Sequence, residues 1–237
     1  MIVTAIFLLG FSPGIFWLWY FYKKDKWEPE PKHLVVKTFF WGLLSAFIAA
    51  LPELPFGEYR MFSLAFLAPV VEELAKFFAV RYTIYNHIEF DEPMDGITYA
   101  AAAALGFASI ENSLYLMGSY GFPFTDFMTQ EPEASSTRIF SLFVARGLLS
   151  VPGHVLFSSS WGFALGWAKF MDKQMARRLL IEGYCIAVLL HGIFNFLGTV
   201  AFYGPPLLIG FVLLLWLLVR KKITHALAGS PHIKTSL

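Results

Sequence analysis

The chain consists of long apolar runs separated by short polar stretches. A membrane-spanning helix needs about 20 consecutive, mostly apolar residues. Runs of comparable length recur along the sequence, at residues 2–22, 33–51, 61–85, 94–118, 138–168, 178–202 and 205–219. The pattern therefore predicts an all-α membrane protein, a polytopic bundle of about seven transmembrane helices.

The composition agrees with this pattern. Of the 237 residues, 57% are hydrophobic and 15% are charged, whereas soluble domains average about 45–50% and about 25%. The mean hydropathy of +0.59 excludes a water-soluble globule and a disordered chain. A net charge of +1 gives no basic field for nucleic acid. The single cysteine, Cys185, excludes a disulfide framework or a Cys-rich zinc site.

No internal repeat, low-complexity tract or linker divides the sequence, so we expect one transmembrane domain over residues 1–237. The first apolar run lacks a basic stretch before it and a small-residue cleavage site after it, and Lys23, Lys24 and Lys26 follow it. It is therefore expected to be a retained anchor rather than a signal peptide.

The loops differ in their content of Lys and Arg, which predicts the orientation. Basic residues gather in alternate loops, at 23–37, 169–178 and 220–222. The loops between them, 52–60, 119–137 and 203–204, carry Arg60, with Arg138 at the edge of the second. Because basic loops stay in the cytoplasm, we expect the N-terminus to lie outside the cell and the C-terminus in the cytoplasm. The expected location is a prokaryotic cell membrane. The acidic and aromatic loop 119–137 is either a connector or a lid that contacts substrate.

Several ionisable residues lie well inside the apolar runs. A strongly charged side chain costs at least about 2.5 kcal/mol at a helix centre, so such residues are expected to meet one another in a water-accessible interior. The group comprises Glu72, Glu73, Lys76, Glu111, Arg146, His154 and His191. Asp95 and Glu182 lie near the predicted cytoplasmic helix ends instead, and we expect them to reach the lipid headgroups.

Four of these residues come from four different runs and lie at similar depths. They are Glu72, Glu111, His154 and His191, all between the midplane and the outer half of the bilayer. This placement predicts a single buried polar site. Asn195 lies four residues after His191, hence on the same helix face, where the two could hold a water or a carbonyl oxygen. The alternative is that each polar residue only bonds a neighbouring helix.

The doublet Glu72-Glu73 is followed by Lys76 at helical spacing. Successive helical residues point about 100° apart, so one carboxylate can face a cavity while the other pairs with Lys76. A carboxylate at such a site can take a proton from water and give it to a leaving amine. The alternative is an intrahelical charge pair that holds helices together. Pro69 and Pro152 precede Glu72 and His154, and each would free a backbone carbonyl and bend its helix beside the site.

Five short motifs, in this order along the chain, resemble those of the PrsW intramembrane proteases. They are Glu28-Pro29-Glu30-Pro31, Glu72-Glu73-x-x-Lys76, Asp95-Gly96 with Gly106-Phe107-Ala108-x-x-Glu111-Asn112, Gly153-His154, and His191-x-x-x-Asn195. The resemblance covers about residues 20–200 and leaves out the seventh helix and the tail, 205–237. The family is in turn similar to the larger group that includes type II CAAX prenyl endopeptidases and bacteriocin-processing proteases.

The resemblance implies a membrane-embedded endopeptidase. In this family the best-known reaction is the site-1 cleavage of a membrane-anchored anti-sigma factor on its extracytoplasmic side. The implied active-site residues are Glu72, Glu73, Glu111, His154 and His191, with Asn195 assisting and Lys76 and Asn112 supporting. The implied partners are a membrane-anchored protein substrate and the lipid bilayer, and no nucleic acid.

Two mechanisms fit these residues. In the first, Glu72 is the general base on a water held with His154, and His191 with Asn195 stabilises the oxyanion. In the second, His154, His191 and Glu111 bind Zn²⁺, with Glu72 as base. No HExxH motif distinguishes the two. We favour the version without a cofactor, because related prenyl endopeptidases are thought to work that way, and keep zinc as the alternative.

Two other classes of function could use the same residues. A proton-coupled transporter could use the carboxylates and imidazoles as a relay, but transporters often contain internal repeats, and none is evident here. A non-catalytic scaffold could bind transmembrane helices, but it would not need the Glu doublet. The sequence therefore favours the protease.

Overall fold

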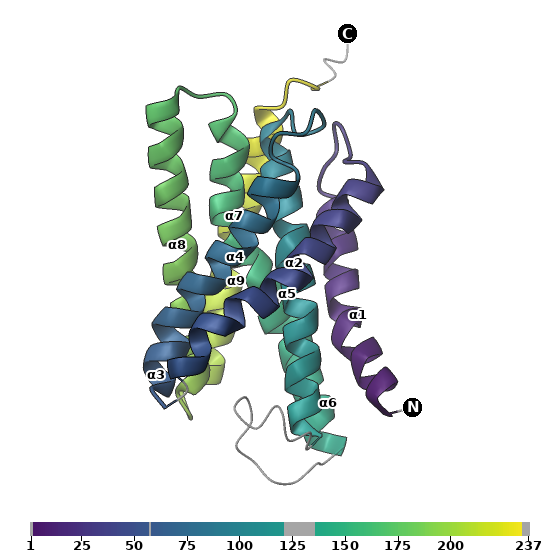
Figure 1. The fold of residues 1–237 in the computed structure, drawn as a ribbon, viewed down its shortest axis with the longest axis vertical. Helices are drawn as coiled ribbons and strands as arrows, with labels where there is room; N and C mark the ends of the chain where they lie inside the picture. The colour runs from purple at the N-terminus through teal and green to yellow at the C-terminus, as the bar shows by residue number, and fades with distance from the viewer. Residues whose placement is uncertain (1, 57, 121–135, 234–237) are drawn as a thin grey trace.

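The structure, a computed structural model, describes residues 2–56, 58–120 and 136–233. Within these ranges every regular element is helical (Figure 1). The long helices are α1 (Ile2–Tyr22), α2 (Lys32–Glu53), α4 (Ala68–Thr83), α5 (Pro93–Ser119), α7 (Val151–Ala168), α8 (Lys173–Thr199) and α9 (Gly204–Ala228). The short helices α3 (Arg60–Phe62) and α6 (Ser136–Ala145) lead towards α4 and α7. The all-α prediction is therefore confirmed.

Among the residues that the structure describes, four helical stretches are long and apolar enough to cross a membrane. They are Ile2–Tyr22, Lys32–Phe56, Ile139–Ala168 and Lys173–Thr199. By contrast, α4 is only 16 residues long and carries Glu72, Glu73 and Lys76. The chain is thus a helical membrane protein in which some helices are specialised for polar contacts.

The helix boundaries depart from the apolar runs mainly where polar residues extend a helix. α8 begins at Lys173 rather than at 178, because the Asp172 side chain accepts hydrogen bonds from the N–H groups of Gln174 and Met175 and caps the first turn. α9 continues to Ala228, past the end of its apolar run at 219. Most of the predicted 119–137 loop lies outside the described residues.

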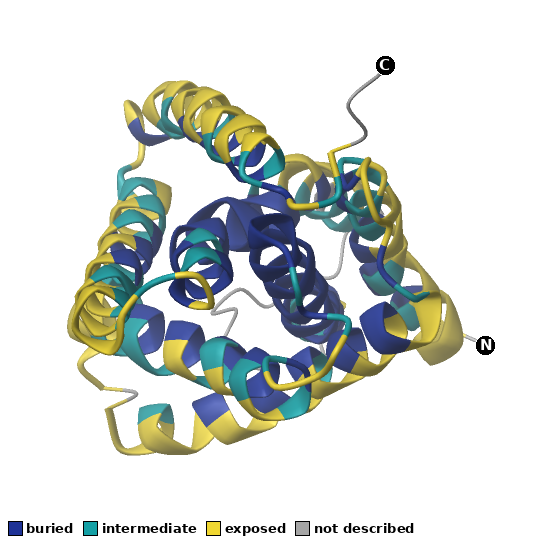
Figure 2. Cartoon of the chain, turned by 90° about the horizontal axis from the view of Figure 1, so that it is seen from above, coloured by how far each residue is buried: buried dark blue, intermediate teal, exposed yellow. Residues whose placement is uncertain are grey.

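α5 occupies the centre of the bundle, in contact with α1, α2, α4 and α7. Its run of alanines from 100 to 104 is fully buried. Gly42 of α2 and Gly162 and Gly166 of α7 lie so close to the backbone of α5 that a Cβ atom would not fit. Small residues therefore let the helices approach closely, and the buried residues gather in the middle of the bundle (Figure 2).

The outer faces of the peripheral helices are apolar. Large exposed hydrophobic side chains include Leu8 of α1, Phe40 of α2, Leu189 of α8 and Leu214 of α9. Lipid chains can cover such faces without hydrogen-bonding demands, because the helical backbone satisfies its own polar groups.

Two π-helical turns interrupt the long helices just before prolines. One spans Ser63–Leu67, ahead of Pro69, and the other spans Arg146–Ser150, ahead of Pro152. A proline lacks an N–H and its ring clashes with the carbonyl four residues earlier, so a wider turn relieves the crowding. A bend was expected at Pro152, and the structure has a π turn directly before that proline. Both turns lie beside the polar residues of the next subsection.

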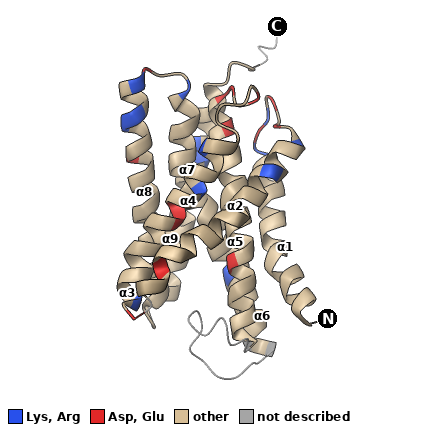
Figure 3. Cartoon of the chain, viewed as in Figure 1, with Lys and Arg blue, Asp and Glu red and all other residues tan. Residues whose placement is uncertain are grey.

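Charged residues are distributed unevenly along the bundle (Figure 3). The α1–α2 connection, the α7–α8 connection and the C-terminus lie at one end, and the N-terminus lies at the other (Figure 1). The basic stretches that begin at Lys23 and at Lys169 belong to that first end. A few acidic and basic residues lie between the two ends, inside the bundle.

Candidate active site

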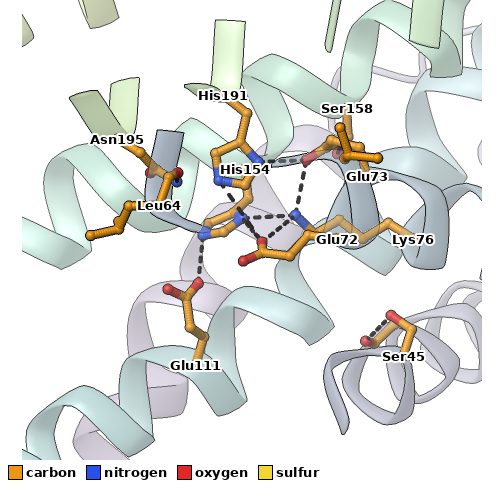
Figure 4. A network of polar contacts seen from close by, with 12 residues as sticks. Ser45, Leu64, Glu72, Glu73, Lys76, Glu111, His154, Ser158, His191 and Asn195 are labelled. Atoms are coloured by element: carbon orange, nitrogen blue, oxygen red, sulfur yellow. Dashed lines mark hydrogen bonds and ion pairs between the residues drawn. The ribbon is translucent and has the colours of Figure 1, made fainter. Parts of the chain in front are cut away.

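Helices α4, α5, α7 and α8 bring the predicted site residues together in the interior (Figure 4). Glu72, Glu73 and Lys76 come from α4, and Glu111 comes from α5. His154 comes from α7 and His191 from α8. The convergence follows from the packing of α4, α7 and α8 around the central α5.

Glu73 is completely buried and both of its carboxylate oxygens are occupied. Oε1 lies 2.9 Å from Lys76 Nζ and 3.2 Å from His191 Nδ1. Oε2 accepts hydrogen bonds from Ser158 Oγ at 2.7 Å and from Trp161 Nε1 at 2.9 Å. A carboxylate with this many partners is held in place and shielded from water. Glu73 is therefore suited to fixing its neighbours rather than to reacting.

Glu72 has a more open environment. Its Oε2 accepts a hydrogen bond from Lys76 Nζ at 3.2 Å and lies 3.8 Å from His191 Nε2 and 4.0 Å from His154 Nδ1. Its side chain retains 11% exposure, against none for Glu73. Glu72 is thus the carboxylate of the doublet that faces both imidazoles and can still be reached.

Lys76 supplies a positive charge at the centre of this group. Its fully buried ammonium donates to both glutamates and also lies 3.0 Å from His154 Nδ1 and 4.2 Å from the centre of the Phe107 ring. An ammonium can only donate, so His154 Nδ1 is the acceptor in this contact. The neutral His154 ring therefore carries its proton on Nε2.

Glu111 contacts the opposite side of His154. Its Oε2 lies 2.8 Å from His154 Nε2, and its Oε1 lies 3.1 Å from Arg146 Nη2. Arg146 Nε also donates to Asn112 Oδ1 at 3.1 Å, and Asn112 Nδ2 donates to the carbonyl of Gly10 at 3.0 Å. Glu111 therefore orients His154, while Asn112 connects α5 to α1.

Asn195 contacts the backbone rather than the other polar side chains. Its Nδ2 donates to the Leu64 carbonyl at 2.9 Å. Within the π turn, the N–H of Ala68 donates five residues back to Ser63. The next donor in that pattern would be residue 69, which is a proline and has no N–H. Asn195 thus supplies the donor that Pro69 cannot, and ties α8 to the turn that leads to Glu72.

Several residues of the network were absent from the sequence-based set. Ser158 and Trp161 lie four and seven residues after His154, so helical spacing from His154 could have indicated them. Glu53, at the end of α2, is electrostatically coupled to Glu111 and Lys76. In the sequence, Glu53 lies in the predicted loop 52–60, directly after an apolar run. The hydropathy pattern therefore does not distinguish it from an ordinary loop carboxylate.

The two residues expected at the headgroups differ in their environments. The Glu182 side chain is exposed and accepts from Arg178 Nε at 2.7 Å, as expected of a surface residue. Asp95, by contrast, is buried, with 1% exposure, so the expectation that it reaches the headgroups is wrong. The α1–α2 connection covers it, since Glu30 and Asp25 of that connection contact it electrostatically.

Comparisons with known proteins define the class of the protein. The model of the family described as PrsW family intramembrane metalloprotease matches residues 30–220. Because this is most of the chain, the protein is an intramembrane protease. It belongs to the PrsW protease family. The match includes most of α9, beyond the motifs that end near residue 200.

Curated relatives agree with the family match. The chain is 35% identical to Protease PrsW of Geobacillus kaustophilus (strain HTA426) over 222 residues, which cover 92% of this chain and 90% of that protein. It is 33% identical to Protease PrsW of Bacillus subtilis (strain 168), over 94% of this chain and 95% of that protein. No solved structure matches the chain.

The family is described as one of metalloproteases, which raises the question of whether these residues could bind a metal ion. Glu72, His154 and His191 offer ligand atoms within 4.8 Å of one another, which is a chemically suitable set for Zn²⁺. The carboxylate that meets both imidazoles is Glu72, whereas Glu111 lies on the far nitrogen of His154. However, Lys76 Nζ lies 3.0 Å from His154 Nδ1 and 3.2 Å from Glu72 Oε2. A Zn²⁺ held about 2 Å from these same atoms would collide with the ammonium, so the arrangement as it stands does not fit a metal.

Proposed function

We propose that the protein hydrolyses a peptide bond of a membrane-anchored protein near the extracytoplasmic side of the membrane, with an anti-sigma factor as the substrate class. The membership of the PrsW family supports a protease acting within the membrane. The observation that carries the catalytic assignment is the open carboxylate of Glu72, which faces two imidazoles and is backed by a saturated neighbour.

In this mechanism, Glu72 is the general base. A water beside Glu72 Oε2 gives its proton to the carboxylate, and the oxygen attacks the carbonyl carbon of the scissile bond. Lys76 and Glu73 hold the Glu72 carboxylate and the His191 ring in place. Glu111 holds His154 from the opposite side.

The negative charge on the carbonyl oxygen then requires a donor. His191 Nδ1 lies 3.2 Å from Glu73 Oε1 and its Nε2 lies 3.8 Å from Glu72 Oε2, so the ring turns Nε2 towards the reacting atoms, where a proton on Nε2 would be donated to the oxyanion. The predicted contribution of Asn195 to the oxyanion rests on its second amide N–H, because the first donates to Leu64. When the C–N bond breaks, Glu72 returns its proton to the leaving amine.

This version needs no metal, since Lys76 supplies the positive charge between Glu72 and His154. The zinc-dependent version would require Lys76 to leave that position. The position of the Lys76 ammonium between Glu72 and His154 therefore supports the metal-independent version. Removal of zinc with a chelator tests it.

We also propose seven membrane spans, with the N-terminus outside and the C-terminus in the cytoplasm. The basic α1–α2 and α7–α8 connections lie at the same end of the bundle as the C-terminus (Figures 1 and 3), which supports this orientation. The protein would then be a multi-pass protein of a prokaryotic cell membrane. A tag-accessibility measurement at each terminus in intact cells tests it, and a C-terminus exposed outside would contradict it.

The direct test of the catalytic assignment uses the purified protein in proteoliposomes with a single-pass anti-sigma-factor reporter. Glu72→Gln keeps the shape of the side chain but removes the base, so we expect cleavage to fall by about 10²–10⁴-fold with the folded yield unchanged. Glu182→Gln, which removes an exposed carboxylate from α8, is the matched control and should cleave normally. Undiminished cleavage by Glu72→Gln would contradict the assignment of Glu72 as the general base, and a wild type that does not cleave the reporter would favour a transporter or a helix-binding scaffold.

A further inference from the structure

A second cluster of buried carboxylates lies away from the catalytic residues, where the α1–α2 connection meets the start of α5. Asp25 and Glu30 come from the connection, Glu92 is the N-cap residue of α5, and Asp95 lies in its first turn. All four residues are at least 97% buried. Four acidic side chains in so small a buried volume are costly unless something offsets their charge.

Capping of α5 accounts for only part of this cluster. Asp95 Oδ2 accepts from the N–H groups of Asp91 at 2.7 Å and Glu92 at 2.8 Å, and the Glu92 side chain completes a capping box. Asp25 and Glu30 have no part in the cap, because they belong to the α1–α2 connection. The capping role therefore leaves two of the four acids unexplained.

Three oxygens of the cluster are buried without a hydrogen-bond partner among the described residues. They are Asp25 Oδ1, Glu92 Oε1 and Asp95 Oδ1. Among the other oxygens, Glu30 Oε2 accepts from Tyr99, Asp25 Oδ2 from Thr98, and Glu92 Oε2 from Ser230. An unpaired buried acceptor is rare in folded proteins and points to a missing partner.

No basic side chain in the described part of the chain neutralises the cluster. In the described ranges, no Lys, Arg or His forms an ion pair with Asp25, Glu30, Glu92 or Asp95. His232 pairs instead with Glu28 at 2.8 Å and Asp91 at 3.0 Å. Lys169 attracts Asp95 only at longer range and is itself exposed.

We propose that Asp25, Glu30 and Asp95 bind a hard divalent cation, Mg²⁺ or Ca²⁺, with Glu92 completing the negative shell. Each of the three ligands offers one oxygen, and these oxygens lie within 4.8 Å of one another. Two oxygens on opposite sides of a Ca²⁺ ion at about 2.3–2.6 Å are separated by about 4.6–5.2 Å, so the spacing suits a shared ion. Carboxylates with no imidazole or thiolate select hard cations over Zn²⁺.

The bound cation would fasten the α1–α2 connection to the start of α5. That attachment holds α1 and α5 together at the end of the bundle opposite the N-terminus (Figure 1). The proposed cation would stabilise the fold and take no part in catalysis. The proposal therefore does not depend on the proposed catalytic mechanism.

The test measures cation binding by the purified full chain in detergent, after treatment with a chelator. We expect the unfolding midpoint of the wild type to rise with Mg²⁺ or Ca²⁺ concentration as linkage requires, and equilibrium dialysis to find one ion per molecule. Asp25→Asn removes a proposed ligand, so we expect its cation affinity to fall by at least about tenfold. His191→Ala removes a catalytic imidazole and should keep the full cation response.

Two results would overturn the proposal. One is a wild-type midpoint and dialysis that do not respond to millimolar Mg²⁺ or Ca²⁺. The other is a cation response of the same size in Asp25→Asn. If Asp25→Asn fails to fold, Glu30→Gln provides the same comparison, and the dialysis of the wild type decides the question without any variant.

Discussion

The two buried acidic clusters of this protein handle charge in opposite ways. In the active-site cluster, Lys76 and Arg146 lie within 3.2 Å of the carboxylates that they neutralise. In the cluster around Asp25 and Asp95, no basic side chain of the described chain forms an ion pair. The first cluster carries its own cations, and the second has the form of a site for a cation from solution.

The difference also shows which carboxylates can react. Glu73 is saturated by four partners and serves as an anchor, whereas the Oε1 atom of Glu72 accepts no hydrogen bond from the described residues and part of the Glu72 side chain is exposed. Lys76 and Arg146 thus neutralise the buried carboxylates, which allows a charged site to exist in a membrane interior. The Glu72 carboxylate nevertheless remains available to react.

Lys76→Met makes the active-site cluster resemble the second one and should have the largest effect on stability. Removing one partner of a buried charge network costs about 3–5 kcal/mol, because Glu73 would be left buried without its cation. The free energy of unfolding in mixed micelles measures this loss. Lys221→Met, at an exposed lysine of α9, is the matched control and should change it by less than about 0.5 kcal/mol. A Lys76→Met protein as stable as the wild type would remove the argument that Lys76 neutralises the buried carboxylates.

Glu73→Gln separates the anchor from the base. The substitution weakens the contacts of Glu73 with Lys76 and His191, so we expect a loss of about 1–3 kcal/mol in the free energy of unfolding. Glu72→Gln should cost less stability, because Glu72 is partly exposed and makes a single hydrogen bond. Equal losses of stability for the two variants would contradict the assignment of different roles.

Asn195→Ala tests the connection between α8 and the π turn before Pro69. It leaves the Leu64 carbonyl unpaired, at a cost of about 1–3 kcal/mol. Pro69→Ala restores a backbone N–H, so the loss caused by Asn195→Ala should be smaller in that background. A double-mutant cycle on unfolding free energies measures the coupling, and strictly additive losses would show that Asn195 does not replace the missing donor.

His232→Ala should have the smallest effect, because this residue is near the surface of the second cluster. Burial lowers the pKa of His232, but the hydrogen bond and charge of Asp91 outweigh it and raise the pKa above 6.5. A raised histidine pKa stabilises the fold below pH 6.5, and this stabilisation disappears as the pH rises through the raised value. We expect a loss below about 1 kcal/mol at pH 6 and almost none at pH 8. A loss that grows from pH 6 to pH 8 would contradict the pairing.

Much of the fold and of the active site follows from the sequence. Hydropathy locates the helices, because lipid imposes a minimum length and an apolar surface. The high cost of a charge in lipid indicates that Glu72, Glu111, His154 and His191 must meet. What the sequence leaves open is which carboxylate of the doublet is occupied, since that depends on Ser158 and Trp161 from another helix.

The burial of the second cluster could not be predicted from the sequence either, because it also depends on contacts between different parts of the chain. Asp95 lies at a helix end, where an acid normally reaches water, so its position gives no sign of burial. Burial arises because the α1–α2 connection folds over it, and Tyr22 and Tyr99 fix Glu30 there by hydrogen bonds. Loop positions of this kind depend on tertiary contacts with no periodic pattern in the sequence.

Zinc quantification combined with cleavage most directly tests whether Lys76 is the cation of the active site. The purified protein would be treated with a zinc-selective chelator, its zinc content measured, and the single-turnover cleavage of the reporter followed in the same sample. We predict that cleavage persists with zinc far below one ion per molecule. Activity that disappears on chelation and returns on addition of Zn²⁺ would contradict the account.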